Sequence, residues 1–133
     1  NDSLFLVAKD KDKIIGLCQL SKDKSKNKLG ALYILPEYQR RGIGKMFWQE
    51  GLKFFTAGLD IYVEVASYNF PAISFYKSLG FKDTNRRLGF NLKNGKIIPE
   101  IEMVLDSNIC PRDKALRQAS CSKLRASSGQ APR

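Results

Sequence analysis

Two short segments contain the residues whose types and spacing could support chemistry. The first reads Gln39-Arg40-Arg41-Gly42-Ile43-Gly44-Lys45. If a helix begins within it, the first backbone N–H groups have no partner inside the helix and lie at the positive end of the helix dipole. Glycine lets the backbone approach a ligand closely, and the neighbouring arginines and lysine add positive charge. The segment therefore predicts a binding site for phosphate groups.

The second segment covers residues 69–81 and reads Asn-Phe-Pro-Ala-Ile-Ser-Phe-Tyr-Lys-Ser-Leu-Gly-Phe. Its Asn69 and Tyr76 are seven positions apart, so they lie near one face of a helix. Each residue also has a purely structural explanation. Asparagine commonly caps a helix N-terminus, and a lone tyrosine is commonly a packed aromatic ring whose hydroxyl is hydrogen-bonded.

Together the two segments resemble the GNAT acetyltransferase family. Residues 32–44 resemble its strand, proline and Gln/Arg-x-x-Gly-x-Gly/Ala pattern, and residues 69–81 resemble Asn-x-x-Ala-x-x-Phe-Tyr-x-x-x-Gly-Phe. In that family the loop amides bind the pyrophosphate of coenzyme A. The preceding strand lines the pantetheine arm and offers a backbone amide to the thioester carbonyl. The asparagine bonds the pantetheine, and the tyrosine hydroxyl faces the sulfur.

The resemblance implies an N-acetyltransferase that uses acetyl-CoA as co-substrate and a primary amine of a small molecule or protein as acceptor. The residues it assigns to acetyl-CoA binding are Ile34, Leu35, Gln39, Arg40, Arg41, Gly42, Ile43, Gly44, Lys45, Asn69 and Tyr76. Tyr76 is also expected to be catalytic, as the general acid that protonates the departing thiolate. A backbone amide near Ile34 is expected to stabilise negative charge on the carbonyl oxygen.

The general base is not identified by these motifs. The chain has no histidine, which excludes hydrolases of the Ser-His-Asp and Cys-His types and argues against a metal site. Glu64, Glu100 and Glu102 are the candidate bases, although we expect each to be a solvated strand residue. Two other functions stay open: a non-catalytic module that binds acetyl-CoA, and a basic adaptor that acts through its C-terminal tail.

Composition is that of one soluble domain. The 133 residues carry a net charge of +10, which suits an anionic ligand, although the sequence does not favour nucleic-acid binding. No apolar run is long enough to span a membrane and no signal peptide precedes the domain, so we expect a cytoplasmic protein. Residues 1–109 are expected to form the domain. Residues 110–133 are expected to be a disordered basic tail or a reading-frame remnant.

Hydrophobic periodicity predicts the elements that position these segments. Strands are predicted at residues 4–9, 14–21, 29–35, 61–66, from 81 onward and at 97–105, and helices at 42–57 and 71–79. This order predicts a mixed α/β (α+β) fold, with a largely antiparallel sheet, one parallel strand pair and helices on both faces. The strand and two helices that begin a GNAT domain have no counterpart here. An exposed edge at residues 97–105 would allow a homodimer.

Overall fold

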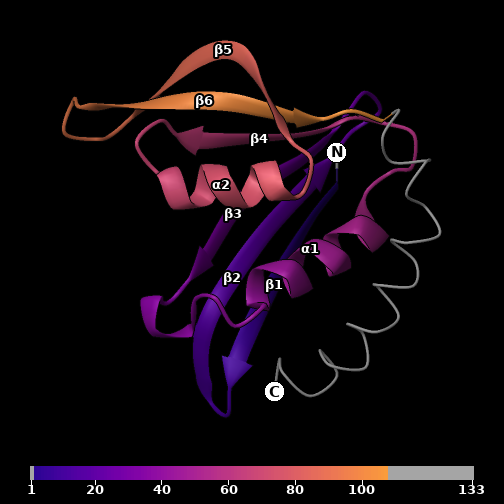
Figure 1. The fold of residues 1–133 in the computed structure, drawn as a ribbon, viewed down its shortest axis with the longest axis vertical. Coiled ribbons are helices and arrows are strands. Elements are labelled where there is room, and N and C mark those ends of the chain that lie inside the picture. Colours follow the sequence, from indigo (N-terminus) through magenta and orange to yellow (C-terminus); the bar gives the residue numbers. More distant parts are fainter. Residues whose placement is uncertain (1, 108–133) are drawn as a thin grey trace.

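A mixed sheet with two helices forms the described part of the chain (Figure 1), and the computed structural model describes residues 2–107. The elements in chain order are β1 (Asp2–Asp10), β2 (Lys13–Lys22), β3 (Asn27–Ile34), the 3₁₀ turn η1 (Pro36–Tyr38), α1 (Ile43–Phe54), β4 (Ile61–Ala66), α2 (Phe70–Ser78), β5 (Lys82–Asn91) and β6 (Ile97–Leu105). The tail predicted at residues 110–133 lies outside the described residues. No helix in the described part is long and apolar enough to cross a membrane.

The sheet has six strands in the order β1-β2-β3-β4-β6-β5. Four of its five strand pairs are antiparallel, and β3 pairs with β4 in parallel. The predicted mixed sheet with one parallel pair is therefore confirmed. A turn containing Gly95, at φ 85°, joins β5 to β6, as the Asn94-Gly95 sequence predicts.

The parallel pair is short, and this shortness positions the site. β3 and β4 pair only over three positions, from Asn27 opposite Ile61 to Leu29 opposite Val63. Beyond these positions β3 continues to Ile34 while β4 runs away from it, so the two strands diverge (Figure 1). One edge of each strand is consequently left without a strand partner in the middle of the sheet.

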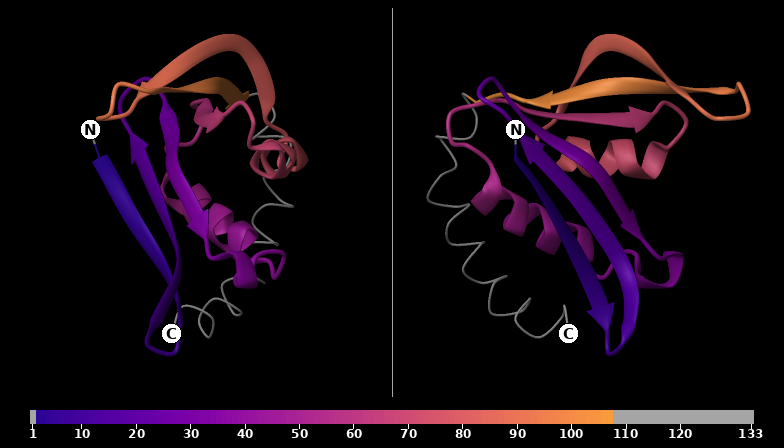
Figure 2. Two further views of the ribbon diagram at one scale, coloured as in Figure 1. Left: turned by 90° about the vertical axis from the view of Figure 1, so that its left-hand side faces the viewer. Right: turned by 180° about the vertical axis from the view of Figure 1, so that it is seen from behind.

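Both helices pack on the same face of the sheet (Figure 2). Trp48 of α1 and Tyr76 of α2 both contact the ring of Phe81, with ring centroids 5.5 and 5.7 Å apart. In β4 the alternate residues Ile61, Val63 and Val65 are buried beneath the helices. The expectation of helices on both faces is therefore wrong for residues 2–107, because periodicity identifies the apolar side of a helix but not the sheet face it covers.

The opposite face of β1, β2 and β3 carries apolar side chains that no described residue covers. Val7, Leu17 and Tyr33 lie side by side across the three strands, and Val7 and Tyr33 are exposed. Phe5 of β1, two residues from Val7, is exposed on the same face.

The edges of the sheet differ from the sequence-based expectation. β6 lies between β4 and β5, so the predicted exposed edge at residues 97–105, and a homodimer formed through it, are not supported. The outer strands are β1 and β5. Pro99 lies one residue beyond the last β4–β6 pair, which joins Ala66 and Glu100. Its missing N–H therefore removes no ladder bond to β4.

Candidate active site

The loop before α1 has an unusual backbone. Arg40 and Gly42 both have positive φ, at 63° and 85°, and Gly42 is the N-cap residue of α1. No side chain caps this helix end, and the first backbone bond into the helix runs from Met46 N to Gly42 O at 3.0 Å. The amides of Ile43, Gly44 and Lys45 therefore precede the first helical hydrogen bond.

This helix end suits an anionic group. A side-chain Cβ placed on Gly42 would meet no atom within 4 Å, so the space in front of the loop is open to a ligand. Arg40, Arg41 and Lys45 add positive charge to that of the helix dipole. The donor set consists of amides and cations, the combination that binds phosphate.

The backbone at the end of β3 distinguishes Ile34 from Leu35. The Leu35 N–H already donates to Ile15 O of β2 at 2.8 Å. Because successive residues of an antiparallel strand point their N–H and C=O groups to opposite sides, the Ile34 amide points away from β2, towards the divergence. The Ile34 carbonyl on that side accepts a hydrogen bond from Gln39 Nε2 at 3.0 Å. Ile34 thus offers an amide to a ligand between the strands, whereas the Leu35 amide is occupied.

Tyr76 lies on α2, next to Phe75, whose ring packs against Gly44 at the start of α1. Tyr76 is only 5% exposed, and its ring packs between Phe75 and Phe81. Its hydroxyl has no hydrogen-bond partner among the described residues. Burial, with a smaller contribution from neighbouring Cys18, raises the pKa of Tyr76 well above its usual range. The phenol is therefore protonated at neutral pH and can donate a proton.

Asn69 has the structural role that its position suggested. It is the N-cap of α2, and its Oδ1 accepts a hydrogen bond from Ala72 N at 3.3 Å. The Nδ2 group of the same side chain is not used in this cap and can donate to a ligand. Capping and ligand binding are thus compatible at this residue.

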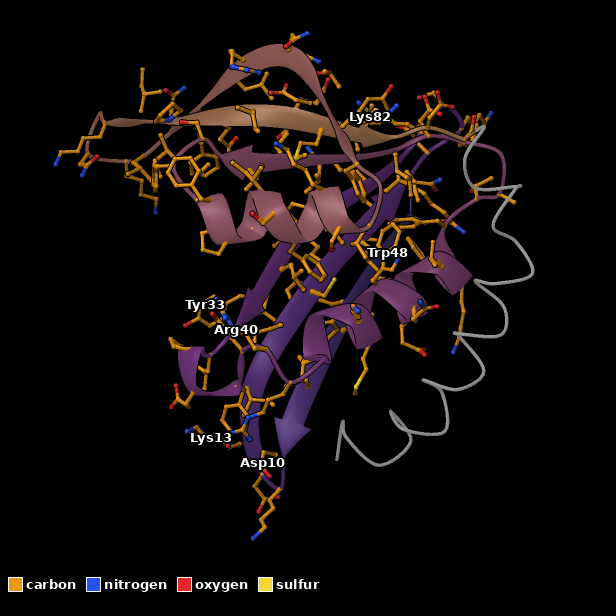
Figure 3. All side chains as sticks on the ribbon, viewed as in Figure 1. Asp10, Lys13, Tyr33, Arg40, Trp48 and Lys82 are labelled. Carbon is orange, nitrogen blue, oxygen red and sulfur yellow. The ribbon has the colours of Figure 1, made fainter. Side chains whose placement is uncertain are left out.

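A polar network that the sequence did not predict joins the β1–β2 turn to the loop before α1. Tyr38 Oη donates to Asp10 Oδ2 at 2.6 Å, and the Arg41 guanidinium lies 5.0 Å from the Tyr38 ring centroid. Lys13 reaches Glu37 at 4.0 Å. Figure 3 shows Asp10, Lys13 and Arg40 at the same end of the sheet. No sequence motif predicts this contact, because Tyr38 and Asp10 are 28 residues apart and come together only in the folded chain.

The carboxylates of β4 and β6 lie on the face opposite the helices. Glu102 is 7% exposed, and its side chain is held by Thr84 Oγ1 at 3.0 Å and Arg86 Nη1 at 3.4 Å. Glu64 forms an ion pair with Lys28 of β3, with Nζ and Oε1 3.2 Å apart. The expectation that these residues are solvated is therefore wrong for Glu102. Glu64 is partly exposed, as expected, but it is also ion-paired with Lys28. Their partners come from strands paired only in the folded sheet.

The loop before α1, the diverging strands and a buried tyrosine thus lie on adjoining elements. The contact between α1 and α2 is close, because a Cβ on Gly44 would lie 3.2 Å from Phe75 Cζ. A comparison with known families agrees with this arrangement. The Acetyltransferase (GNAT) family matches residues 1–81. The chain belongs to the GNAT family.

Two curated relatives are named as N-acetyltransferases. The chain is 32% identical over 83 residues to the peptidyl-lysine N-acetyltransferase YjaB of Salmonella typhimurium, covering 62% of this chain and 52% of the relative. It is 30% identical over 97 residues to an N-alpha-acetyltransferase of Sulfurisphaera tokodaii, covering 62% of this chain and 58% of the relative. The chain thus spans somewhat more than half the length of these relatives.

Solved GNAT structures share the fold. The PaiA N-acetyltransferase of Thermoplasma acidophilum, solved in complex with coenzyme A, has 28% sequence identity and a TM-score of 0.62. The match covers 79% of this chain and 61% of that chain. The mixed sheet with diverging β3 and β4 is therefore a GNAT fold.

Proposed function

We propose that this GNAT chain transfers the acetyl group of acetyl-CoA to a primary amine. The observation that carries the proposal is the combination of three features on adjoining elements: the uncapped N-terminus of α1, the free Ile34 amide at the β3–β4 divergence and the unpaired hydroxyl of the largely buried Tyr76. Two curated relatives that modify lysine side chains or protein N-termini support a protein amine as acceptor.

The residues fit the parts of acetyl-CoA. Positive charge and free amides at residues 40–45 suit the pyrophosphate, and the unpaired edge of β3 suits the amide groups of the pantetheine arm. The Ile34 amide can donate to the thioester carbonyl oxygen as negative charge develops there, a contribution of the kind worth about 2.7–4 kcal/mol. Tyr76 can give its proton to the departing sulfur.

Glu64 is the carboxylate best placed to take a proton from the acceptor amine. It is the first residue of β4 beyond Val63, the last residue paired with β3, so it lies beside the divergence. Its side chain is 35% exposed and faces away from the helices. Glu102 is already held by other side chains, and Glu100 lies farther along the sheet, opposite Ala66.

Replacement of Tyr76 by phenylalanine tests the proposal. The purified chain would be incubated with acetyl-CoA and peptides that offer either an N-terminal amine or a lysine, and thiol release and peptide mass would be followed. We expect Tyr76→Phe to lower kcat by roughly 10²–10⁴-fold, the usual contribution of a general acid. Acetyl-CoA affinity, measured by calorimetry, should stay the same because the hydroxyl acts on the leaving group.

Tyr68→Phe is the matched control, since Tyr68 immediately precedes Asn69 but its side chain is exposed. It should retain wild-type turnover. Unchanged kcat in Tyr76→Phe would refute the catalytic role of this hydroxyl. Acetyl-CoA binding without transfer to any peptide or small amine would instead support a non-catalytic acetyl-CoA-binding module.

A further inference from the structure

A tyrosine beside the loop before α1 connects that loop to a distant turn of the chain. Tyr38 is the last residue of η1, two positions before Arg40. Its hydroxyl donates a hydrogen bond of 2.6 Å to Asp10 Oδ2, at the end of β1. A hydrogen bond to a carboxylate is charge-assisted, and such bonds are shorter and stronger than those between neutral groups. The β1–β2 turn therefore anchors the Tyr38 side chain.

The anchored ring holds a cation. The Arg41 guanidinium lies over the Tyr38 ring, 5.0 Å from its centroid, which is within the range of a cation–π interaction. Arg41 immediately precedes Gly42, the N-cap residue of α1. Among residues 2–107 no carboxylate forms an ion pair with Arg41. Its positive charge is thus held near the helix N-terminus and is available to an anion.

The second cation at this ring has a partner of opposite charge. Lys13 Nζ lies 5.9 Å from the Tyr38 ring centroid and 4.0 Å from Glu37 Oε2. Because the two charges of this pair offset each other, the pair attracts an anion less than a lone cation does. Arg41 is therefore the cation through which Tyr38 can act on an anionic ligand.

The backbone between Tyr38 and α1 has an uncommon conformation. Arg40 has φ 63°, in the left-handed region that residues with a side chain rarely adopt. Such a conformation persists only where the surrounding structure holds it. Two side-chain hydrogen bonds precede it, from Tyr38 to Asp10 and from Gln39 Nε2 to Ile34 O at 3.0 Å. These contacts preform the loop before a ligand arrives.

We propose that Asp10 and Tyr38 are positioning residues for the coenzyme. Asp10 anchors Tyr38, and the Tyr38 ring holds Arg41 where its guanidinium binds the phosphate groups of acetyl-CoA. This inference rests on the proposed function, in which the loop before α1 receives the pyrophosphate. Asp10 and Tyr38 act without touching the coenzyme, because a guanidinium that is already held in place loses less conformational freedom when the ligand binds.

A double-mutant cycle on acetyl-CoA affinity tests the link between Tyr38 and Arg41. Calorimetry would give dissociation constants for wild-type protein, Tyr38→Leu, Arg41→Gln and the double variant. We expect Tyr38→Leu to weaken binding about 2–5-fold, the usual size of an exposed cation–π contact. In the Arg41→Gln background the same change should have no further effect, because the side chain through which it acts is gone. Equal losses in both backgrounds would overturn the proposal.

Asp10→Ala tests the anchor, and Asp12→Ala is its matched control. Both variants remove a carboxylate from the same stretch of chain, but only Asp10 accepts the Tyr38 hydrogen bond. Loss of a nearby negative charge by itself favours an anionic ligand, so Asp12→Ala should bind acetyl-CoA at least as tightly as wild type. Asp10→Ala should bind it more weakly despite the same change in charge. Unchanged or tighter binding in Asp10→Ala, or equal losses in both variants, would refute the anchoring role.

A donor without phosphate groups separates positioning from general damage to the site. S-acetylpantetheine has the thioester and the pantetheine arm of acetyl-CoA but no phosphate. Tyr38→Leu should raise the KM for acetyl-CoA about 2–5-fold and leave kcat unchanged, and kcat/KM for S-acetylpantetheine should not change. Equal losses with both donors would show that the substitution disturbs the whole site, which contradicts a role confined to the phosphate groups.

Wild-type transfer and variant binding decide separate questions. If wild-type protein binds acetyl-CoA but transfers no acetyl group, the proposed function fails, and the calorimetric cycle still decides the roles of Asp10 and Tyr38. If transfer occurs and the Tyr38 and Arg41 losses are additive, the proposed function stands and the positioning roles fail. Absence of acetyl-CoA binding in folded wild-type protein would overturn both.

Discussion

Replacement of Gly42 by aspartate should strongly weaken acetyl-CoA binding while costing only modest stability. Gly42 has φ 85° and no atom within 4 Å of the Cβ position, so an added side chain meets strain but no clash. The left-handed conformation costs a non-glycine residue roughly 1–2 kcal/mol. The new carboxylate would project from the N-cap of α1 into the proposed pyrophosphate site.

The size of the binding loss follows from Coulomb's law. Two phosphate charges about 5 Å from the new carboxylate are repelled by roughly 2–7 kcal/mol, for effective dielectric constants between about 80 and 20. Acetyl-CoA at 100 times its dissociation constant stabilises the wild-type fold by about 2.7 kcal/mol. A loss of even 2 kcal/mol reduces this stabilisation to less than about 1 kcal/mol at the same acetyl-CoA concentration.

The assay is the melting temperature with and without acetyl-CoA. For a domain of about 100 residues, 1 kcal/mol corresponds to about 4 °C, so the wild-type shift should be roughly 10 °C and the Gly42→Asp shift a few degrees at most. Gly58→Asp is the matched control, because Gly58 has φ 84° and an equally open Cβ position beyond the other end of α1.

Both aspartate variants should melt several degrees below wild type without ligand, and only Gly58→Asp should keep the full acetyl-CoA shift. A full shift in Gly42→Asp would refute the placement of the pyrophosphate at this loop. Loss of the shift in both variants would mean that strain alone, rather than the local charge, prevents binding.

Two further predictions concern the fold. Asn27 is fully buried. Its Nδ2 group donates to Thr56 O at 2.9 Å and to Leu59 O at 3.2 Å, and its Oδ1 accepts from Thr56 N at 2.9 Å. Asn27→Ala should therefore lower the free energy of unfolding by roughly 2–4 kcal/mol, as measured by urea titration. A loss below about 1 kcal/mol would show that water replaces these bonds. Burial raises the pKa of the Cys18 thiol to about 12, so little thiolate is present at pH 8. Cys18 in the native protein should therefore resist alkylation at pH 8, which peptide mass spectrometry would measure. Labelling of Cys18 as fast in native as in urea-unfolded protein would contradict its buried position.

The sequence alone determined the elements and the family. β4 and β6 begin and end at the predicted residues, because alternating apolar residues identify a strand whose one face is buried. The glycines and cations of residues 39–45 predicted an anion site, because a helix N-terminus has free amides wherever it occurs. Asn69 was likewise readable as a cap, since capping depends on neighbours three residues away.

The tertiary structure decided what depends on contacts between distant segments. Sequence could not tell Ile34 from Leu35 as the amide donor, because the choice depends on which side of β3 is paired with β2. From the sequence we also expected helices on both faces of the sheet and an exposed edge at β6. Both expectations were wrong, because local periodicity specifies neither the sheet face that a helix covers nor the strand order. The pairing of Lys28 with Glu64 spans 36 residues of sequence, and only the short parallel register of β3 and β4 brings these charges together.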